Sequence, residues 1–417
     1  MKIRLTRLCE PYFCLMVNAN LLKEEVRLFI RQHEQDDPGS IALLTNKISG
    51  VHASELAAQI AGRQKAKNKI QTYYAKDTII YPPSLNMEQS SSEATAKFKV
   101  ALLEELGITK DRVLADLSAG FGIDSFFFSR ALKKVIHVEP NNTLQEIAQH
   151  NHLALGANNI VYVNKTAEEF LSASEESVDL AYVDPSRRIE NRKVFALSDC
   201  APNIPELQHE IFEYTKVLIL KAAPLLDISA GIKSLRFVKD VVVLSVDNEC
   251  KELLFICERG FLGEPLISAV NIQIKGSSNS TFSFTQSQEH NAILDYNEPG
   301  TYLYEPNASI LKSGAFKSVA QRLAVGKLAA STHLYTSNEL LTDFPGRIFK
   351  IEHITKADPK FVHSLLPDKK ANVITRNYPL SAESLKKKLK LMDGGDHYIL
   401  AFASSKQKYV TVCSRIK

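Results

Sequence analysis

From Val113 onward, short runs of β-branched residues alternate with amphipathic segments, and this alternation limits the fold more than any other feature of the chain. The runs cover residues 113–117, 134–138, 160–163, 178–183, 216–221 and 241–246. Apolar residues recur at three- and four-residue intervals between most of these runs, which is typical of helices. Strands that alternate with helices usually form a parallel sheet with both faces covered. The sequence therefore predicts an α/β fold with a doubly wound sheet.

The remaining segments predict what surrounds this sheet. Residues 252–258 follow the sixth run too closely for a helical crossover, so we expect a terminal antiparallel hairpin and a seventh strand. Residues 21–75 have helical periodicity, which ends at the prolines of YPPSL (81–85). Near the C-terminus we expect a helix over 313–332 and two strands, HYILAFA and KYVTVCS.

A chain of 417 residues exceeds the usual size of one hydrophobic core. We predict a helical region over residues 1–80, the sheet domain over 81–274 and a polar linker or ferredoxin-like segment over 275–318. A smaller α+β domain is expected over 319–417.

Charge is unevenly distributed along the chain. From Glu305 to Lys417 there are 19 lysines and arginines against 9 acidic residues, a balance of +10. The net charge of the whole chain is +4, so the remaining residues carry −6. A basic module joined to an acidic body is the usual outline of a polyanion-binding appendage, although a solvated basic surface is the alternative.

Other compositional features concern location and metals. No apolar run approaches the ~20 residues of a membrane helix, and Glu10 and Pro11 interrupt the apolar N-terminus, which disfavours a signal peptide. The six cysteines form no CxxC pair and have no ligand spacing with histidines. We therefore expect a cytoplasmic protein without a structural metal site or a membrane partner.

The turn LADLSAGFGIDSF (114–126) is the sharpest functional signal. A strand ends at Asp116, and a turn of small residues leads into a helix. Gly120 and Gly122 allow the backbone to approach a ligand, and the first strand of an open α/β sheet is where such folds bind ligands.

Two ligands compete for this turn. A dinucleotide-binding turn needs G-x-G-x-x-G, whereas the third glycine position is Ser125 here. S-adenosylmethionine enzymes have an acid before the turn, which can hold the methionine ammonium, and Asp116 supplies it. A carboxylate would repel a pyrophosphate. S-adenosylmethionine is favoured, and a turn without ligand is the remaining alternative.

Acids and polar groups end the neighbouring strands. Glu139 follows the second strand and can accept hydrogen bonds from ribose hydroxyls, in NAD as well as in S-adenosylmethionine. The third strand leads to Thr166, a weaker candidate for the adenine contact. The fourth strand ends in VDPSRR, where Asp184 and the carbonyls fixed by Pro185 could hold a target amine. Arg187 suits a phosphate or a stacked base. An N-capping aspartate with surface arginines is the alternative.

Together these motifs resemble the class I S-adenosylmethionine-dependent methyltransferases, and more closely the bacterial group, frequent in Bacteroidetes, with a C-terminal THUMP-like domain. The resemblance runs from about residue 23 to the C-terminus. It rests on LADLSAGFGID, VEPN, YVDPSRR, VDNECKELL, LYEPNASILKSGAFKSVA, FPGRIF and LKLMDGGDHYILAF.

The resemblance implies a Rossmann-like sheet with an antiparallel seventh strand, S-adenosylmethionine as methyl donor, and RNA presented by the THUMP-like domain over 319–417. We assign donor binding to Asp116, Ser118, Ala119, Gly120, Gly122, Glu139 and Thr166, and the acceptor side to Asp184, Pro185 and Arg187.

The sequence departs from two relatives of this group. Ser186 and Arg187 replace the second proline and the tyrosine of D-P-P-Y, which disfavours methylation of the adenine N6 atom. Uridine C5 enzymes need a cysteine after strand 5, whereas Cys250 lies one strand later.

The alternatives from other classes are a catalytically silent RNA-binding protein and a nicotinamide-dependent oxidoreductase, the latter disfavoured by Asp116. Methyl transfer to a protein or small molecule also stays open.

Overall fold

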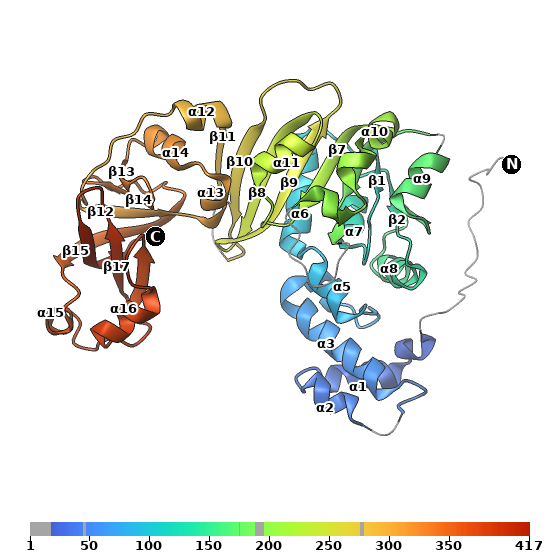
Figure 1. Ribbon diagram of the computed structural model, residues 1–417. Helices are drawn as coiled ribbons and strands as arrows, with labels where there is room; N and C mark the ends of the chain where they lie inside the picture. The colour runs from blue at the N-terminus through green and yellow to red at the C-terminus, as the bar shows by residue number, and fades with distance from the viewer. Residues whose placement is uncertain (1–17, 45–46, 175, 188–195, 276–278) are drawn as a thin grey trace. The chain divides into compact units, whose positions relative to one another are not determined.

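The computed structural model describes residues 18–44, 47–174, 176–187, 196–275 and 279–417 (Figure 1). The chain divides into two compact units, residues 1–221 and 222–417, and each is described by itself. None of the helices in the described ranges is long and apolar enough to cross a membrane.

The first unit begins with a group of helices. They are η1 (Ala19–Leu22), α1 (Glu24–Gln32), α2 (Pro38–Ala42), α3 (Ala53–Lys69), α4 (Gln71–Tyr74), α5 (Ser84–Gln89) and α6 (Glu93–Glu105). The predicted helical region over 21–75 is thus confirmed, with breaks between α1, α2 and α3. At the start of α6, the Ser92 hydroxyl caps the helix by accepting a hydrogen bond from the Thr95 N–H at 3.2 Å.

Strands and helices then alternate as the sequence predicts. They are β1 (Val113–Asp116), α7 (Ile123–Ser129), β2 (Lys134–Val138), α8 (Asn142–Ala154), β3 (Ile160–Val163), α9 (Ala167–Ala173), β4 (Val178–Val183), α10 (Ile204–Tyr214) and β7 (Thr215–Ala222). A short pair of strands, β5 (Ser186–Arg187) and β6 (Cys200–Ala201), and η2 (Leu197–Asp199) lie between β4 and α10.

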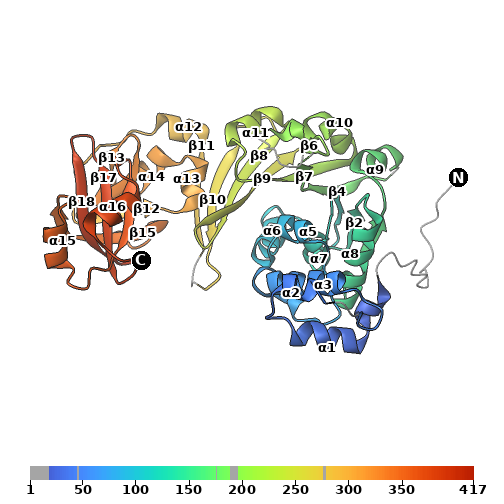
Figure 2. The ribbon, with the colours of Figure 1, turned by 60° about the horizontal axis from the view of Figure 1, so that its bottom comes forward.

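These strands form a parallel sheet with the order β7-β4-β1-β2-β3. Helices α9 and α10 lie on one side of it, and α6, α7 and α8 lie on the other (Figure 2). The strand order reverses at β1, which has β2 on one side and β4 on the other. In doubly wound sheets the ligand binds at the carboxyl ends of the strands at this point. The predicted fold class is confirmed, and it places the ends of β1 and β4 next to each other.

The second unit begins with α11 (Ile228–Ser234) and four strands. Strands β8 (Val238–Val246) and β9 (Glu249–Glu258) form the predicted antiparallel hairpin. Two strands that were not predicted follow: β10 (Leu266–Ile272) pairs with β8, and β11 (Ser280–Thr285) pairs with β10. Segment 275–291, interpreted as a polar boundary, therefore contains β11 and the helix α12 (Gln286–Asn291), because Phe282 and Phe284 alternate with polar residues and are buried.

The rest of the second unit is built around a seven-stranded sheet with the order β13-β14-β12-β15-β18-β17-β16. Its strands are β12 (Tyr302–Pro306), β13 (Gly326–Ala329), β14 (Thr332–Ser337), β15 (Gly346–Thr355), β16 (Asn372–Arg376), β17 (His397–Ala403) and β18 (Lys408–Arg415). The helices of this part of the chain are α13 (Ala308–Ser313), α14 (Phe316–Arg322), α15 (Pro359–Leu365) and α16 (Ala382–Leu389), of which α13 packs against β8, β9 and β10. The two predicted C-terminal strands are β17 and β18, and they are antiparallel.

The predicted helix over 313–332 is wrong in its second half. Helix α14 ends at Arg322, Ala324 has a positive φ of 51°, and Gly326–Ala329 form β13. Strand pairing with β14 outweighs the helical periodicity of this segment, which is a common outcome when tertiary contacts oppose a local preference.

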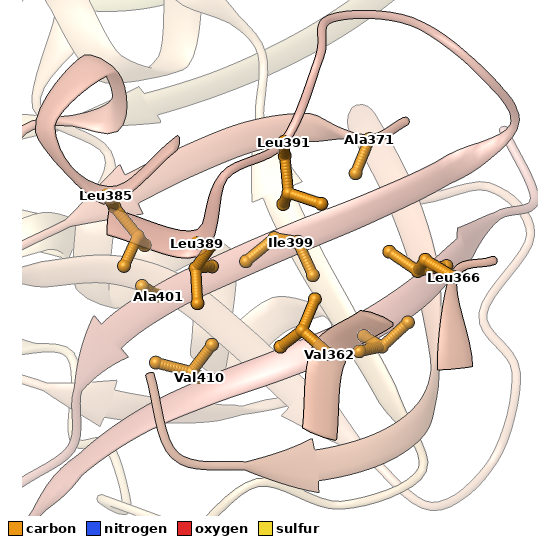
Figure 3. Packing of buried hydrophobic residues seen from close by; sticks show 10 residues of the cluster. Val362, Leu366, Ala371, Leu385, Leu389, Leu391, Ile399, Ala401 and Val410 are labelled. Atoms are coloured by element: carbon orange, nitrogen blue, oxygen red, sulfur yellow. The ribbon is translucent and has the colours of Figure 1, made fainter. Parts of the chain in front are cut away.

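One hydrophobic core of this unit lies where α15 and α16 cover the sheet. Val362, Leu385, Leu389 and Ile399 are fully buried there. Figure 3 shows these side chains with Leu366, Leu391, Ala371, Ala401 and Val410 gathered around the strand that carries Ile399. Buried leucines at 385 and 389 fix one face of α16, so the lysines between them lie on its other faces.

Candidate active site

The turn after β1 has the backbone that its glycines predict. Gly120 and Gly122 have φ values of +58° and +81°, in the left-handed region that favours glycine. A Cβ on Gly122 would lie 2.6 Å from Cε1 of His152, whereas a Cβ on Gly120 would meet nothing closer than the Ser118 carbonyl at 4.0 Å. The loop is therefore packed against the protein at Gly122 and open at Gly120, where a ligand could lie against the backbone.

Asp116 ends β1 and is almost completely buried, with 1% of its surface exposed. The Ser125 hydroxyl donates to its Oδ2 at 2.6 Å, and the Ser118 N–H lies 3.5 Å from Oδ1. Burial, helped by the neighbouring Asp124 and Asp184, raises the pKa of Asp116 to about 8. Within the described ranges Asp116 forms no ion pair. A ligand cation would supply its missing counter-charge.

Glu139 lies just after β2 and is hydrogen-bonded to the loop that follows β1. Its Oε2 accepts a hydrogen bond from the Gly120 N–H at 2.9 Å, and its Oε1 accepts one from the Asn141 N–H at 2.8 Å. Ala119 holds the same loop from the other direction, because its N–H donates to the Val138 carbonyl at 3.0 Å. Each carboxylate oxygen can accept a second hydrogen bond, so the hydroxyls of a ribose can still be bound.

Thr166 begins α9 as its N-cap. Its hydroxyl accepts from the Glu169 N–H at 3.2 Å, and Glu169 in turn accepts from the Thr166 N–H at 3.0 Å. This reciprocal cap accounts for Thr166 without a ligand. Its contact with an adenine therefore stays a prediction.

The two sharpest motifs of the sequence meet through Ser118. The Asp184 N–H, just after β4, donates to the Ser118 hydroxyl at 2.7 Å. The carboxylate of Asp184 forms an ion pair with Lys221, which lies in β7 beside β4. Pro185 follows, and Ser186 and Arg187 form β5, paired with β6. The structure describes only the backbone of Arg187, and Arg188 lies outside the described residues.

Lys221 is a residue that the sequence did not reveal. Its side chain is 11% exposed and that of Asp184 is 32% exposed, so the pair lies at the margin of the site. A lysine at the end of the fifth strand, in LKAAP, has no distinguishing sequence pattern. Asp184 becomes its neighbour only because β4 and β7 pair in parallel, and the sequence does not show this pairing.

A second ion pair that the sequence did not reveal connects α6 with α7. Lys99 of α6 is fully buried and its Nζ lies 3.0 Å from Oδ1 of Asp124, in the first turn of α7. The hydroxyls of Ser91 and Tyr182 each donate to Oδ2 of Asp124 at 2.7 Å. Burial alone would raise the pKa of Asp124, but Lys99, Lys221 and these hydroxyls keep it below its usual value. This network joins α6 to α7, the helix that directly follows the loop.

Two buried histidines support the loop from behind. The His152 Nε2–H donates to the Gly122 carbonyl at 2.9 Å, because a carbonyl can only accept, and the Tyr162 hydroxyl donates to His152 Nδ1 at 2.9 Å. His137 Nδ1 lies 3.2 Å from the Ser125 hydroxyl that binds Asp116. Burial lowers the pKa of His152 to about 4 and that of His137 well below its usual value. Both rings are therefore neutral near pH 7.

Neither a cysteine nucleophile nor a metal centre is supported by the described residues. Burial raises the pKa of the Cys250 thiol, which leaves it protonated and poorly nucleophilic. The described residues contain no cluster of three or more potential metal ligands.

Comparisons with known proteins add the following. A family model described as a ferredoxin-like domain matches residues 302–345, and one described as THUMP domain-like matches residues 346–415. No curated protein matches the chain.

Among solved structures, the chain is 28% identical to the "putative methyltransferase from Porphyromonas gingivalis W83". That match covers 94% of this chain and 97% of the other, with a TM-score of 0.83. A "putative RNA methyltransferase" from Pyrococcus horikoshii is 17% identical, covering 42% of this chain and 91% of that one, with a TM-score of 0.33. A "putative methyltransferase" from Streptococcus mutans in complex with SAH is 15% identical, covering 39% and 96%, with a TM-score of 0.31.

The first of these matches spans nearly the whole length of both chains, and the family models identify the C-terminal part. The chain is therefore similar over nearly its whole length to a putative methyltransferase of known structure, and it carries a THUMP domain-like region over residues 346–415.

Proposed function

We propose that the chain is an S-adenosylmethionine-dependent methyltransferase that acts on RNA. The observation that carries this proposal is the buried carboxyl of Asp116 without a cation partner in the described residues, beside a glycine loop that is open at Gly120. The methionine ammonium of the donor would supply that cation. The loop backbone would accept the remainder of the amino-acid portion, and Glu139 would bind the ribose hydroxyls.

The donor supplies a methyl group that its sulfonium already activates, so the protein mainly has to align an acceptor. The Ser118 hydroxyl fixes the backbone of Asp184, and Pro185 holds the chain that follows. The Asp184 carboxylate would accept a hydrogen bond from the N–H or O–H that is to be methylated. The ion pair with Lys221 limits the rotation of the Asp184 side chain.

This arrangement suits a protic acceptor, which loses a proton when it is methylated. Asp184 would take that proton as transfer proceeds, so that the methylated acceptor is released without an additional positive charge. Methylation of a carbon through a covalent cysteine adduct is disfavoured, because the Cys250 thiol stays protonated.

RNA as the substrate is supported by two features. A THUMP domain-like region covers residues 346–415, and the chain from Glu305 onward has an excess of ten positive charges. A basic surface binds the phosphate backbone of RNA without regard to sequence, so this affinity should fall steeply with salt.

The donor is tested by calorimetric titration of the full chain with S-adenosylmethionine, with NADH as the control ligand. Binding of S-adenosylmethionine alone supports the proposal, binding of NADH alone overturns it, and binding of neither leaves the silent RNA-binding protein as the better reading. Transfer is then measured with methyl-labelled donor and total bacterial RNA.

The acceptor side is tested with Asp184→Asn against Asp111→Asn, which removes an exposed carboxylate before β1. Asp184→Asn should abolish transfer and change donor affinity only a few-fold, whereas Asp111→Asn should behave as the wild type. If Asp184→Asn reduces donor affinity as much as transfer, the residue supports the structure instead. Label recovered in protein and absent from RNA would contradict the RNA assignment.

A further inference from the structure

A pocket lies among the N-terminal helices, within the first unit. It is small and open to solvent, and it is lined by Leu21, Arg27, Ile30, Gln59, Arg63, Asp77, Ile79 and Tyr81. The lining comes from η1, from α1 and α3, which lie side by side in Figure 1, and from the segment after α4. None of these residues belongs to the candidate active site.

Two hydrogen-bond donors of this lining have no partner in the protein. The Nε–H of Arg27 and the hydroxyl of Tyr81 are both buried without a hydrogen bond to any described residue. Tyr81 is only 5% exposed. Buried donors of this kind are rare in folded proteins, and each needs an explanation such as a bound ligand or water. The guanidinium Nε of Arg27 can only donate a hydrogen bond, so a ligand that binds it must supply an acceptor atom.

The other polar groups of the pocket already have partners. The Gln59 amide exchanges hydrogen bonds with the backbone of Tyr81, at 2.9 and 2.8 Å. The Arg63 Nε donates to Glu34 at 2.7 Å and another of its nitrogens lies 3.4 Å from Asp77. These contacts hold the segment after α4 against α3. They leave Arg27 and Tyr81 as the groups available for a ligand.

The charge around the pocket favours an anion. The two carboxylates there are Glu34, which pairs with Arg63 and Lys67, and Asp77, which pairs with Arg31 and Arg63. Burial opposes ionisation of Glu34, but hydrogen bonds from Tyr74 and Arg63 outweigh it and lower its pKa to about 2. Arg27 forms no ion pair with the described residues. Among the residues that line the pocket, Arg27 and Arg63 thus carry positive charge and Asp77 carries negative charge.

We propose that this pocket binds a small oxyanion of the phosphate type through Arg27 and Tyr81. The anion would accept hydrogen bonds from both groups and compensate the charge of Arg27, while Leu21, Ile30 and Ile79 form the apolar wall. The phosphate could be a free ion or the terminal phosphate of a nucleic acid, since both present the same oxygens. This site is separate from the proposed donor and acceptor sites.

The test measures the melting temperature of the full chain in chloride-free buffer of low ionic strength, with increasing inorganic phosphate. The variants are Arg27→Gln and Tyr81→Phe. Arg31→Gln is the control, because it removes the same charge from an exposed side chain that pairs with Asp77 and does not line the pocket. A ligand that binds only the folded state raises the melting temperature as its concentration rises.

We expect phosphate to raise the melting temperature of the wild type and of Arg31→Gln. Arg27→Gln should weaken phosphate binding at least about tenfold, and Tyr81→Phe about two- to tenfold. The loss is larger for Arg27 because a hydrogen bond from a charged donor is stronger than one from a neutral hydroxyl. Without phosphate, both variants should melt no lower than the wild type, because each removes an unsatisfied buried donor. A lower melting temperature for both variants, together with an unchanged response to phosphate, would mean that these groups only support the fold.

A parallel titration uses a short RNA oligonucleotide with and without a 5′-phosphate. Stabilisation by inorganic phosphate identifies the free ion as a ligand, and stabilisation by the phosphorylated oligonucleotide alone identifies an RNA end. Both results support the site when Arg27→Gln abolishes them. No effect of either probe, or equal effects on wild type and Arg27→Gln, overturns the proposal and leaves bridging water as the partner of the two donors.

Discussion

The burial of Asp116 predicts that donor binding releases a proton. Burial raises the pKa of its carboxyl from the ordinary value of 3.8 to about 8, so at pH 6.5 most molecules of the free protein hold this proton. At the same pH, an α-amino group with an ordinary pKa of ~7.7–8.0 is charged. An ammonium placed beside the carboxyl favours the carboxylate. Binding of S-adenosylmethionine at pH 6.5 should therefore expel close to one proton.

Calorimetric titrations at pH 6.5 in two buffers with different ionisation enthalpies measure that number directly. The dissociation constant should also fall about tenfold per pH unit between pH 5 and 7, because the ionised form of Asp116 becomes more available. The histidines near the loop do not contribute to this pH dependence, because burial lowers the pKa of His152 to about 4 and that of His137 well below its ordinary value. Asp116→Asn should bind weakly and without proton release. Release of fewer than about 0.3 protons by the wild type would refute the reasoning.

The same carboxyl sets a pH dependence of stability in the absence of ligand. A raised pKa in the folded state means that the protonated form is preferred there, so this contribution is present below pH 3.8 and is lost as the pH rises towards 8. From pH 6 to pH 8 the loss is at most about 2–3 kcal/mol of the free energy of unfolding. Urea denaturation at the two pH values measures it, and saturating S-adenosylmethionine should remove most of the difference. His137 and His152, whose pKa values burial lowers, add stability over the same pH range, so the change is compared with that of Asp116→Asn. An equal change in the wild type and in Asp116→Asn would contradict the raised pKa of Asp116.

Three further predictions concern single residues. Lys221→Met should lower the rate of methyl transfer about 100-fold or more and change the donor dissociation constant only a few-fold, whereas equal losses would indicate a structural role. Lys99→Met should cost about 3–5 kcal/mol in urea denaturation, because Asp124 keeps a buried charge without its ammonium, and Asp124→Asn in the same chain should restore much of the loss. Gly122→Ala should weaken donor binding more than tenfold in calorimetry, since its Cβ would clash and its φ is positive, whereas Gly156→Ala, at a similar φ in open space, should not.

The sequence predicted the elements that follow from local pattern. Strand and helix alternation predicted a parallel, doubly wound sheet, and in the structure β1 and β4 are neighbours in that sheet, so that Ser118 binds the backbone of Asp184. Gly120 and Gly122 predicted a turn with positive φ values, which the structure has at both positions. Such features are predictable because each depends on a few neighbouring residues and on the usual handedness of crossovers.

Contacts between distant side chains were not predictable. Lys99 lies on a helix whose pattern gives a lysine a solvent-exposed place, yet it is fully buried, because Asp124 of α7 offers it a carboxylate. Residues 326–329 continue a helical pattern, but α14 ends at Arg322 and these residues pair with β14 instead. In both cases a tertiary partner, which no local pattern records, outweighs the local preference.

The three aspartates at the carboxyl edge of the sheet differ in one respect that bears on function. Asp124 is balanced by Lys99 and Asp184 by Lys221, whereas Asp116 has no cation among the described residues. Two of the three therefore hold the structure in place through pairs that are complete without a ligand. The third carries its proton until a cation arrives, because an uncompensated buried carboxylate is costly. A donor with an ammonium group would complete these pairs at Asp116, because a cation beside the carboxyl favours its ionised form, and a pyrophosphate offers no such cation.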